Sequence, residues 1–393
     1  MSEQEPVDGG QVIDRRQWLE VRVDGLIESQ RHDEAIGYLC RLFEELDDPV
    51  GLARCATYLG YLYLLEGDLT RSEQWLERAR ERDADDPHLS YALGHVALLR
   101  GAPWRAVLRF MEAFVEAEEA HDAAEFLRSG ACALRAGGQP APAVSMLLGA
   151  LDRDLGNPWI LDGLARVYQE NERWLESLQV LKELGRVVAQ AASSMVVRRS
   201  PSARYLLRER LIRRSVRVGD VEARAREVNL QLRQRFEVVL DGRQRRGPTG
   251  LAPRQFPRAL GHLLDVLGGE ERGLELSESA LGLWAQASHE RFGDYLGAES
   301  LAAAVHVLVE RLHWRVPSSA QRIAAAHGVD EERVGPAARV VAGKLGLQLF
   351  DTQAIFSELN LEERRRFEAL SRALLFGEGL SAARTSGPSL GGK

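Results

Sequence analysis

Two histidines, His88 and His95, lie seven residues apart, a spacing that places both side chains on one face of a helix. Imidazoles in this arrangement could bind a zinc ion if carboxylates or thiols completed the ligand set. No carboxylate or cysteine completes such a set, and Cys40, Cys55 and Cys132 form no CxxC pair. We therefore expect no metal site, and we interpret the cysteines as buried thiols of a reducing cytoplasm.

Sequence signatures of catalysis are also missing. The chain has no GxxxxGK[ST] loop, no HExxH and no GxSxG. The glycines of "LGHLLDVLGGEERG" follow no strand pattern, so they are not a phosphate-binding loop, and strand patterns are rare throughout. The sequence thus predicts a protein that is not an enzyme, has no cofactor and binds no identifiable small-molecule substrate.

Arginine is concentrated in the middle of the chain. Residues 198–258 contain 17 arginines against 6 acidic residues, although the whole chain has a net charge of −7. Arginine binds phosphate oxygens through a planar fork, so this segment is a candidate nucleic-acid surface. The candidate phosphate contacts are Arg208, Arg213, Arg214, Arg217, Arg243, Arg245 and Arg246. The alternative is a helical hairpin that caps the preceding helices, with its arginines solvated or paired.

The elements that would position these residues follow a repeat of 34 residues in the N-terminal half. The matched positions are Gly60 and Gly94, Gly67 and Gly101, Leu76 and Phe110, and Ala79 and Ala113. Such a period is typical of helix pairs that cannot bury their apolar faces alone and therefore stack. We expect the two prolines of "RAGGQPAPAV" (135–144) to perturb the second helix of one pair.

These repeats resemble the tetratricopeptide repeat family, over about residues 14–188 and roughly five helix pairs. The resemblance implies an α-solenoid whose first helices line a concave groove that binds a protein or peptide partner. The implied groove residues are Arg54, Thr57, Tyr61, Leu64, His88, Tyr91, His95, Leu98, Leu127, Trp159, Asp162 and Arg166. Rings and flanking charges suit peptide capture. The alternative is that the tyrosines and leucines only pack against the next repeat.

About five helices are predicted between residues 255 and 356, including one with a run of alanines. This part resembles the cyclin-box fold of transcription factor IIB-like proteins. Within it, Ala324, Gly328 and Val334 have the spacing of a helix-turn-helix. The second of these helices begins with acidic residues, and we expect Gly335 and Pro336 to interrupt it. We therefore interpret this segment as a structural hairpin rather than a DNA reader.

The chain of 393 residues is long enough for two or three domains, and we expect neither a signal peptide nor a membrane-spanning apolar run. We expect an all-α cytoplasmic adaptor: a solenoid at 14–188, an arginine-rich cap and linker at 198–250, and a compact cyclin-like five-helix bundle at 255–356. A C-terminal helix at 361–376 and a disordered tail at 381–393 follow. The alternatives are a nucleic-acid-associated transcriptional regulator and a self-assembling scaffold.

Overall fold

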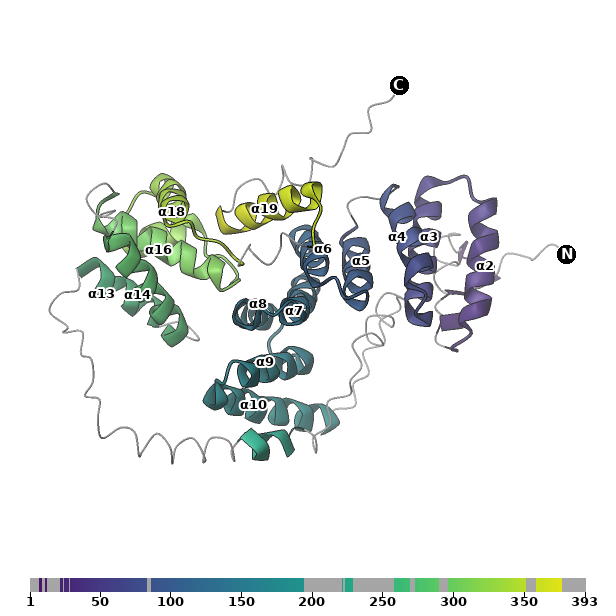
Figure 1. Cartoon of the computed structure of the whole chain (residues 1–393), viewed down its shortest axis with the longest axis horizontal. Helices are drawn as coiled ribbons and strands as arrows, with labels where there is room; N and C mark the ends of the chain where they lie inside the picture. The colour runs from purple at the N-terminus through teal and green to yellow at the C-terminus, as the bar shows by residue number, and fades with distance from the viewer. Residues whose placement is uncertain are drawn as a thin grey trace, which may run out of the picture.

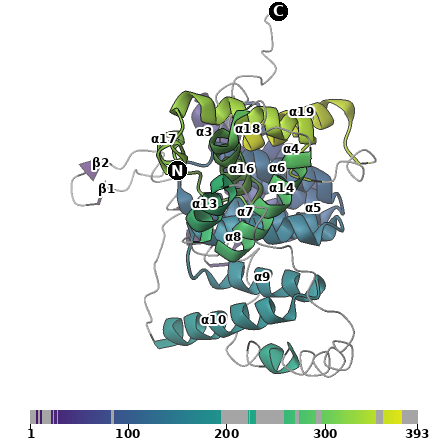
Figure 2. The ribbon, with the colours of Figure 1, turned by 90° about the vertical axis from the view of Figure 1, so that its left-hand side faces the viewer.

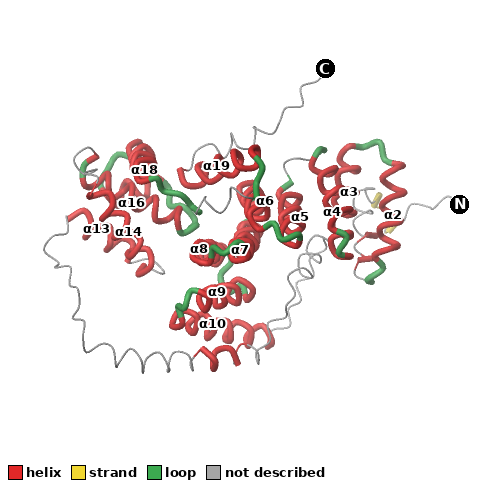
Figure 3. Tube along the Cα trace, viewed as in Figure 1, coloured by secondary structure: helices red, strands yellow, loops and turns green. Residues whose placement is uncertain are grey.

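The structure is a computed structural model of the chain. It describes residues 7–8, 11–12, 22–23, 25–27, 29–82, 86–193, 221, 223–228, 258–268, 273–289, 296–350 and 358–376. These residues are almost entirely helical (Figures 1 and 3), which confirms the expected all-α class. In the described ranges, strand structure is confined to β1 (Val7–Asp8) and β2 (Gln11–Val12), an antiparallel pair in which Val7 faces Val12.

Helix pairs make up the N-terminal half of the chain, and Figure 1 shows them stacked one after another. After α2 (His32–Glu45) come α3 (Pro49–Glu66), α4 (Leu69–Arg80), α5 (Pro87–Leu99), α6 (Pro103–Glu116), α7 (Ala120–Ala136), α8 (Pro140–Arg153), α9 (Pro158–Glu170) and α10 (Trp174–Ser193). We call α3–α10 the helix-pair array. Its A helices are α3, α5, α7 and α9, and its B helices are α4, α6, α8 and α10.

The starts of three A helices are determined by an Asp-Pro or Asn-Pro dipeptide. In each, proline is the first helical residue, where no backbone N–H is needed and its fixed φ suits the helix. The residue before it caps the helix: the side chains of Asp48, Asp86 and Asn157 each accept a hydrogen bond of 3.0 Å from a first-turn N–H. The sequence therefore marks helix starts more sharply than helix ends.

The A and B helices of three pairs approach each other at the same point. Three A-helix glycines each face a large B-helix side chain sixteen residues later: Gly60 with Leu76, Gly94 with Phe110, and Gly130 with Met146. A Cβ atom at these glycines would come within 2.5, 2.6 and 2.8 Å of those side chains. The 34-residue period thus reflects one close contact that recurs from pair to pair.

The two prolines of "RAGGQPAPAV" do not perturb α8, contrary to the expectation from sequence. Pro140 is the first residue of the helix and Pro142 lies in its first turn. Backbone N–H groups in the first turn have no partner within the helix, so proline removes no hydrogen bond there.

A second group of helices forms the C-terminal part. It consists of α13 (Arg258–Gly268), α14 (Gly273–His289), α16 (Ala298–Leu312), α17 (Ala320–His327) and α18 (Glu331–Leu345), which we call the bundle. Helix α16 is its centre, because every residue from Leu301 to Glu310 is buried. Figure 2 shows the bundle from the side, with α16 surrounded by its neighbours.

The hairpin of α17 and α18 has the tight turn that its sequence predicts. Gly328 ends α17 with a φ of +65°, and both Ala324 and Val334 are buried. However, α18 continues through Gly335 and Pro336, so the expected interruption is wrong. The residue before a proline resists helix mainly through its Cβ atom, which Gly335 lacks.

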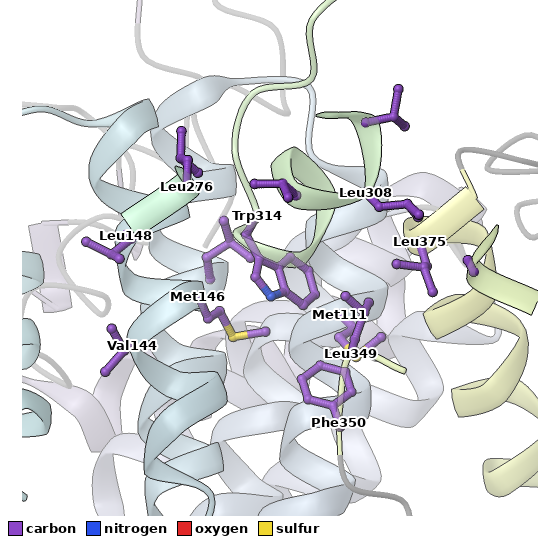
Figure 4. Close-up of a cluster of buried hydrophobic side chains, with 14 of the residues drawn as sticks. Met111, Val144, Met146, Leu148, Leu276, Leu308, Trp314, Leu349, Phe350 and Leu375 are labelled. Atoms are coloured by element: carbon purple, nitrogen blue, oxygen red, sulfur yellow. The ribbon is translucent and has the colours of Figure 1, made fainter. Parts of the chain in front are cut away.

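Trp314 connects the array to the bundle. It follows α16 directly, is 5% exposed and has a φ of +55°, a left-handed conformation that is costly for a bulky residue. Its backbone lies against Gly149 of α8, where a Cβ atom would come within 2.4 Å of the Trp314 carbonyl oxygen. Figure 4 shows its indole among side chains of both parts, including Met111 and Met146 of the array and Leu308 of α16.

Polar contacts reinforce this junction. The guanidinium of Arg153 donates hydrogen bonds to the carbonyl oxygens of Gly149 (2.8 Å) and Trp314 (2.5 Å), and lies 5.1 Å from the centre of the Phe114 ring. Burial, only partly offset by Asp152, lowers the pKa of Arg153 to about 10, so it stays charged at neutral pH. Arg315 pairs with Asp152 at 3.2 Å.

Helix α19 (Leu361–Phe376) packs on α6 and has the bounds expected from sequence. The rings of Trp104 and Phe367 meet edge to face at 6.4 Å. Arg105 donates to Glu363 at 2.9 Å, and Arg366 donates to Glu112 at 3.1 Å. The bundle and α19 therefore both rest on B helices of the array, α8 and α6.

The junction predicts opposite effects for two glycine-to-alanine changes in helix interiors. Gly149→Ala forces the Trp314 backbone away and should lower the free energy of unfolding by about 1–3 kcal/mol. Gly163→Ala on α9 meets Leu147 only at 3.4 Å, so the better helix propensity of alanine should leave stability unchanged or raise it by up to about 1 kcal/mol. Urea denaturation measures both; equal effects would contradict the close contact.

Candidate partner-binding surface

The twelve implied groove residues lie on the A helices, but they do not form one open surface. Five are buried: Thr57, Tyr61, Leu64, Tyr91 and Leu127, at 1–5% exposure. Seven are partly exposed: Arg54, His88, His95, Leu98, Trp159, Asp162 and Arg166. We call the seven the A-face set. The expected exposure of the first five is therefore wrong, because successive A helices pack closely enough to enclose them.

Two tyrosines of the buried group tie neighbouring A helices together. The Tyr61 hydroxyl on α3 donates to the His88 carbonyl oxygen on α5 at 2.9 Å. The Tyr91 hydroxyl on α5 donates to a carboxylate oxygen of Glu125 on α7 at 2.8 Å. Buried hydroxyls need such partners, so these tyrosines hold the array together rather than offer rings to a ligand.

Glu125 is the centre of a buried charged cluster that the sequence pattern did not single out. Arg128 grips its carboxylate with two donors, at 2.6 and 2.9 Å, and the side chains of Glu125 and Arg128 are 4% and 12% exposed. Burial acts to lower the pKa of Arg128, but the charge of Glu125 outweighs it and raises that pKa overall. The 34-residue period could have identified Glu125, because it lies 34 residues after Tyr91.

His95 stands beside this cluster. Its ring meets those of Tyr91 and Phe110 edge to face, with centroids 4.6 and 5.1 Å apart. Its Nε2 atom is buried and has no hydrogen-bond partner in the part of the chain that the structure describes. Burial, reinforced by the charge of Arg128, lowers the pKa of His95 to about 4. His95 is therefore neutral at physiological pH.

His88 and His95 do not act together as metal ligands. His88 faces Asp122 of α7, with Nε2 and Oδ2 3.5 Å apart, while His95 is enclosed by rings. In the described ranges, no group of three histidine, cysteine or acidic side chains is placed to hold a metal ion.

At the C-terminal end of the array, Asp162 is covered from two sides. Arg166 donates to it at 2.9 Å, and Arg224 pairs with its other oxygen. Arg224 belongs to a short helical stretch whose Val221 and Val228 are buried against α9 and α10. This stretch of the arginine-rich segment thus caps the array. The seven candidate phosphate contacts (Arg208, Arg213, Arg214, Arg217, Arg243, Arg245 and Arg246) lie outside the described residues.

The buried, neutral His95 should make the stability of the folded protein sensitive to acid. Its pKa of about 4 in the folded state is lower than its ordinary value of about 6.5, so folding excludes the proton. This stability is fully present above pH 6.5 and is lost as the pH falls toward 4, with a loss of about 2 kcal/mol between pH 7 and 5. Urea midpoints at the two pH values should therefore fall less in His95→Phe than in wild type. His121→Gln, at an exposed histidine, should behave as wild type; equal losses in all three proteins would contradict the assignment.

Comparison with known proteins found no family model that matches the chain and no match among curated proteins. In the described ranges, no helix is both long enough and apolar enough to cross a membrane. The functional argument therefore rests on the arrangement of residues given above.

Proposed function

We propose that the chain is a non-enzymatic cytoplasmic adaptor. The array would act as a tetratricopeptide-like solenoid whose A helices receive a protein or peptide partner, and the bundle would be a cyclin-like module that docks a second protein. The observation that carries this proposal is the asymmetry of the array. Both contacts that fix the bundle and α19, Gly149 with Trp314 and α6 with α19, use B helices.

The chemistry of the A-face set supports a partner with little net charge. Its apolar members, Leu98 and Trp159, are partly exposed, and tryptophan is a typical anchor in protein interfaces. The charges of Asp162 and Arg166 are satisfied by each other, so they add little attraction for a charged peptide. An apolar side chain of the partner placed between polar neighbours fits this surface best.

The contact with α19 is an intramolecular example of the proposed activity. Here the array binds a helix through a ring contact at Trp104 and two flanking ion pairs. A helix-pair array that holds one helix in this manner on its B side has the packing geometry to hold another on its A side.

The A-face set can be tested by comparing two double variants in affinity capture from native lysate. His88→Ala with Trp159→Ala removes partly exposed rings from the A face, whereas Leu155→Ala with Leu175→Ala removes side chains that are 69% and 53% exposed and lie outside the A helices. The first variant should reduce capture of specific partners at least about tenfold, the loss of one or two interface anchors. The second should capture as wild type does, and circular dichroism should show equal helicity.

Two outcomes would contradict the proposal. Unchanged capture of partners by the A-face variant would show that the A helices are not the binding surface. Partners that disappear when the lysate is treated with nuclease would instead favour the nucleic-acid-associated function, which predicts binding that weakens steeply with salt.

A further inference from the structure

A chain of buried ionisable groups crosses the bundle where α17 packs on α16. His306 and Glu310 on α16 are each 3% exposed, and His327 at the end of α17 is 5% exposed. Nδ1 of His306 lies 3.0 Å from Nε2 of His327, and Nε2 of His306 lies 3.6 Å from a carboxylate oxygen of Glu310. Three titratable side chains in an otherwise apolar core are costly to bury, which suggests a role.

The Glu310 carboxylate, at one end of this row of ionisable groups, is held by hydrogen bonds. Glu310 accepts hydrogen bonds from the backbone N–H of Ser318 at 3.0 Å and from its hydroxyl at 2.7 Å. Burial acts to raise the pKa of Glu310, but the neighbouring His306 and the bonds from Ser318 outweigh it and hold that pKa below its ordinary value. Glu310 is therefore an anion that attracts the Nε2 hydrogen of His306.

The Glu310 anion determines which nitrogens carry hydrogen when both imidazoles are neutral. With the His306 hydrogen on Nε2, its Nδ1 accepts a hydrogen bond from Nε2–H of His327. Nδ1 of His327 then carries no hydrogen. A nitrogen without a hydrogen suits this position, because Nδ1 of His327 is buried and has no hydrogen-bond partner in the described residues. The neutral pair thus joins α17 to α16, while the Nε2 hydrogen of His306 is stabilised by the charge of Glu310 at 3.6 Å rather than by a hydrogen bond.

One additional proton changes this balance. The hydrogen bond between the imidazoles can hold one hydrogen, and Nε2 of His306 already has its own, so the extra proton must reach Nδ1 of His327. A buried N–H donor without an acceptor destabilises the docked state. The other charged groups nearby give no relief, because His262 on α13, Arg311 on α16 and Arg339 on α18 are cations or can become cations.

We propose that Glu310, His306 and His327 form a proton-sensitive latch that holds α17 on α16 near neutral pH and releases it in acid. Helix α17 has only eight residues, and its buried side chains are Ile323, Ala324 and His327. The imidazole contact is therefore, with the bond of 2.5 Å between His262 Nε2 on α13 and the Ala326 carbonyl oxygen, one of the polar contacts that hold it. Release would uncover part of α16 without requiring the array or the junction at Trp314 to open.

The sign and size of the effect follow from linkage. Burial, with the charges of His306 and His262, lowers the pKa of His327 to about 4 while α17 is docked. After release, the pKa returns to about 6.5, so protonation favours the released state as the pH falls below 6.5 and the gain levels off near pH 4. Between pH 7 and pH 5, the release equilibrium should rise about 20-fold.

Hydrogen exchange of the full chain, read by mass spectrometry, tests this latch. After correction for the intrinsic pH dependence of exchange, protection of the amides of residues 320–327 should be weaker than that of α9 at both pH values, because α17 opens locally, and should fall about 20-fold from pH 7 to pH 5. His327→Gln keeps a donor near the Nε2 position but cannot titrate, so protection of α17 should then fall much less between pH 7 and pH 5. His121→Gln, an exposed histidine on α7, should behave as wild type.

Three results would overturn the proposal. The first is a wild-type α17 whose protection does not fall, and the second is protection of α17 equal to that of α9 at both pH values, which would indicate exchange by global unfolding alone. The third is the same fall in His327→Gln. If that variant did not fold, the wild-type comparison of α17 with α9 would still decide the question.

Discussion

The contact between Gly149 and Trp314 is the constraint on which the arrangement of the molecule depends. A tryptophan held with positive φ at the end of α16 reaches α8 only because α8 has no side chain at that position. Arg153 then satisfies the carbonyl oxygens of both residues, so that no backbone acceptor is stranded at the contact. Because α16 is also the centre of the bundle, fixing its end to α8 fixes the whole bundle against the array.

The array is built on a similar principle. In three pairs a glycine on the A helix allows a leucine, phenylalanine or methionine of the B helix to enter, and between pairs tyrosine hydroxyls and charged side chains bridge the A helices. These bridges fill the space that an open groove would need. What stays accessible on the A helices is a narrow track of partly exposed side chains, and the adaptor function proposed for this chain depends on that track.

Much of the fold could be predicted from the sequence because its signals were local or periodic. The 34-residue period located the pairs, Asp-Pro dipeptides marked helix starts, and Gly328 marked the turn before α18. The prediction from sequence overestimated proline as a helix breaker. Pro142 stands in a first turn, where it removes no hydrogen bond, and Pro336 follows a glycine, which has no Cβ atom to clash with the proline ring. Burial of Tyr61 and Tyr91 was not predictable, since it depends on the spacing of successive A helices. The partnership of Gly149 with Trp314 joins residues far apart in the chain and follows no period.

The central claim is that the array and the bundle form one rigid adaptor held at Trp314. The most direct measurement is a distance distribution between spin labels placed, through a non-natural amino acid, at exposed positions Leu175 on α10 and Val340 on α18. A single narrow distribution in the unsubstituted background, which broadens when Trp314 is replaced by alanine, is the predicted result. A broad distribution that is the same with and without the indole would contradict it.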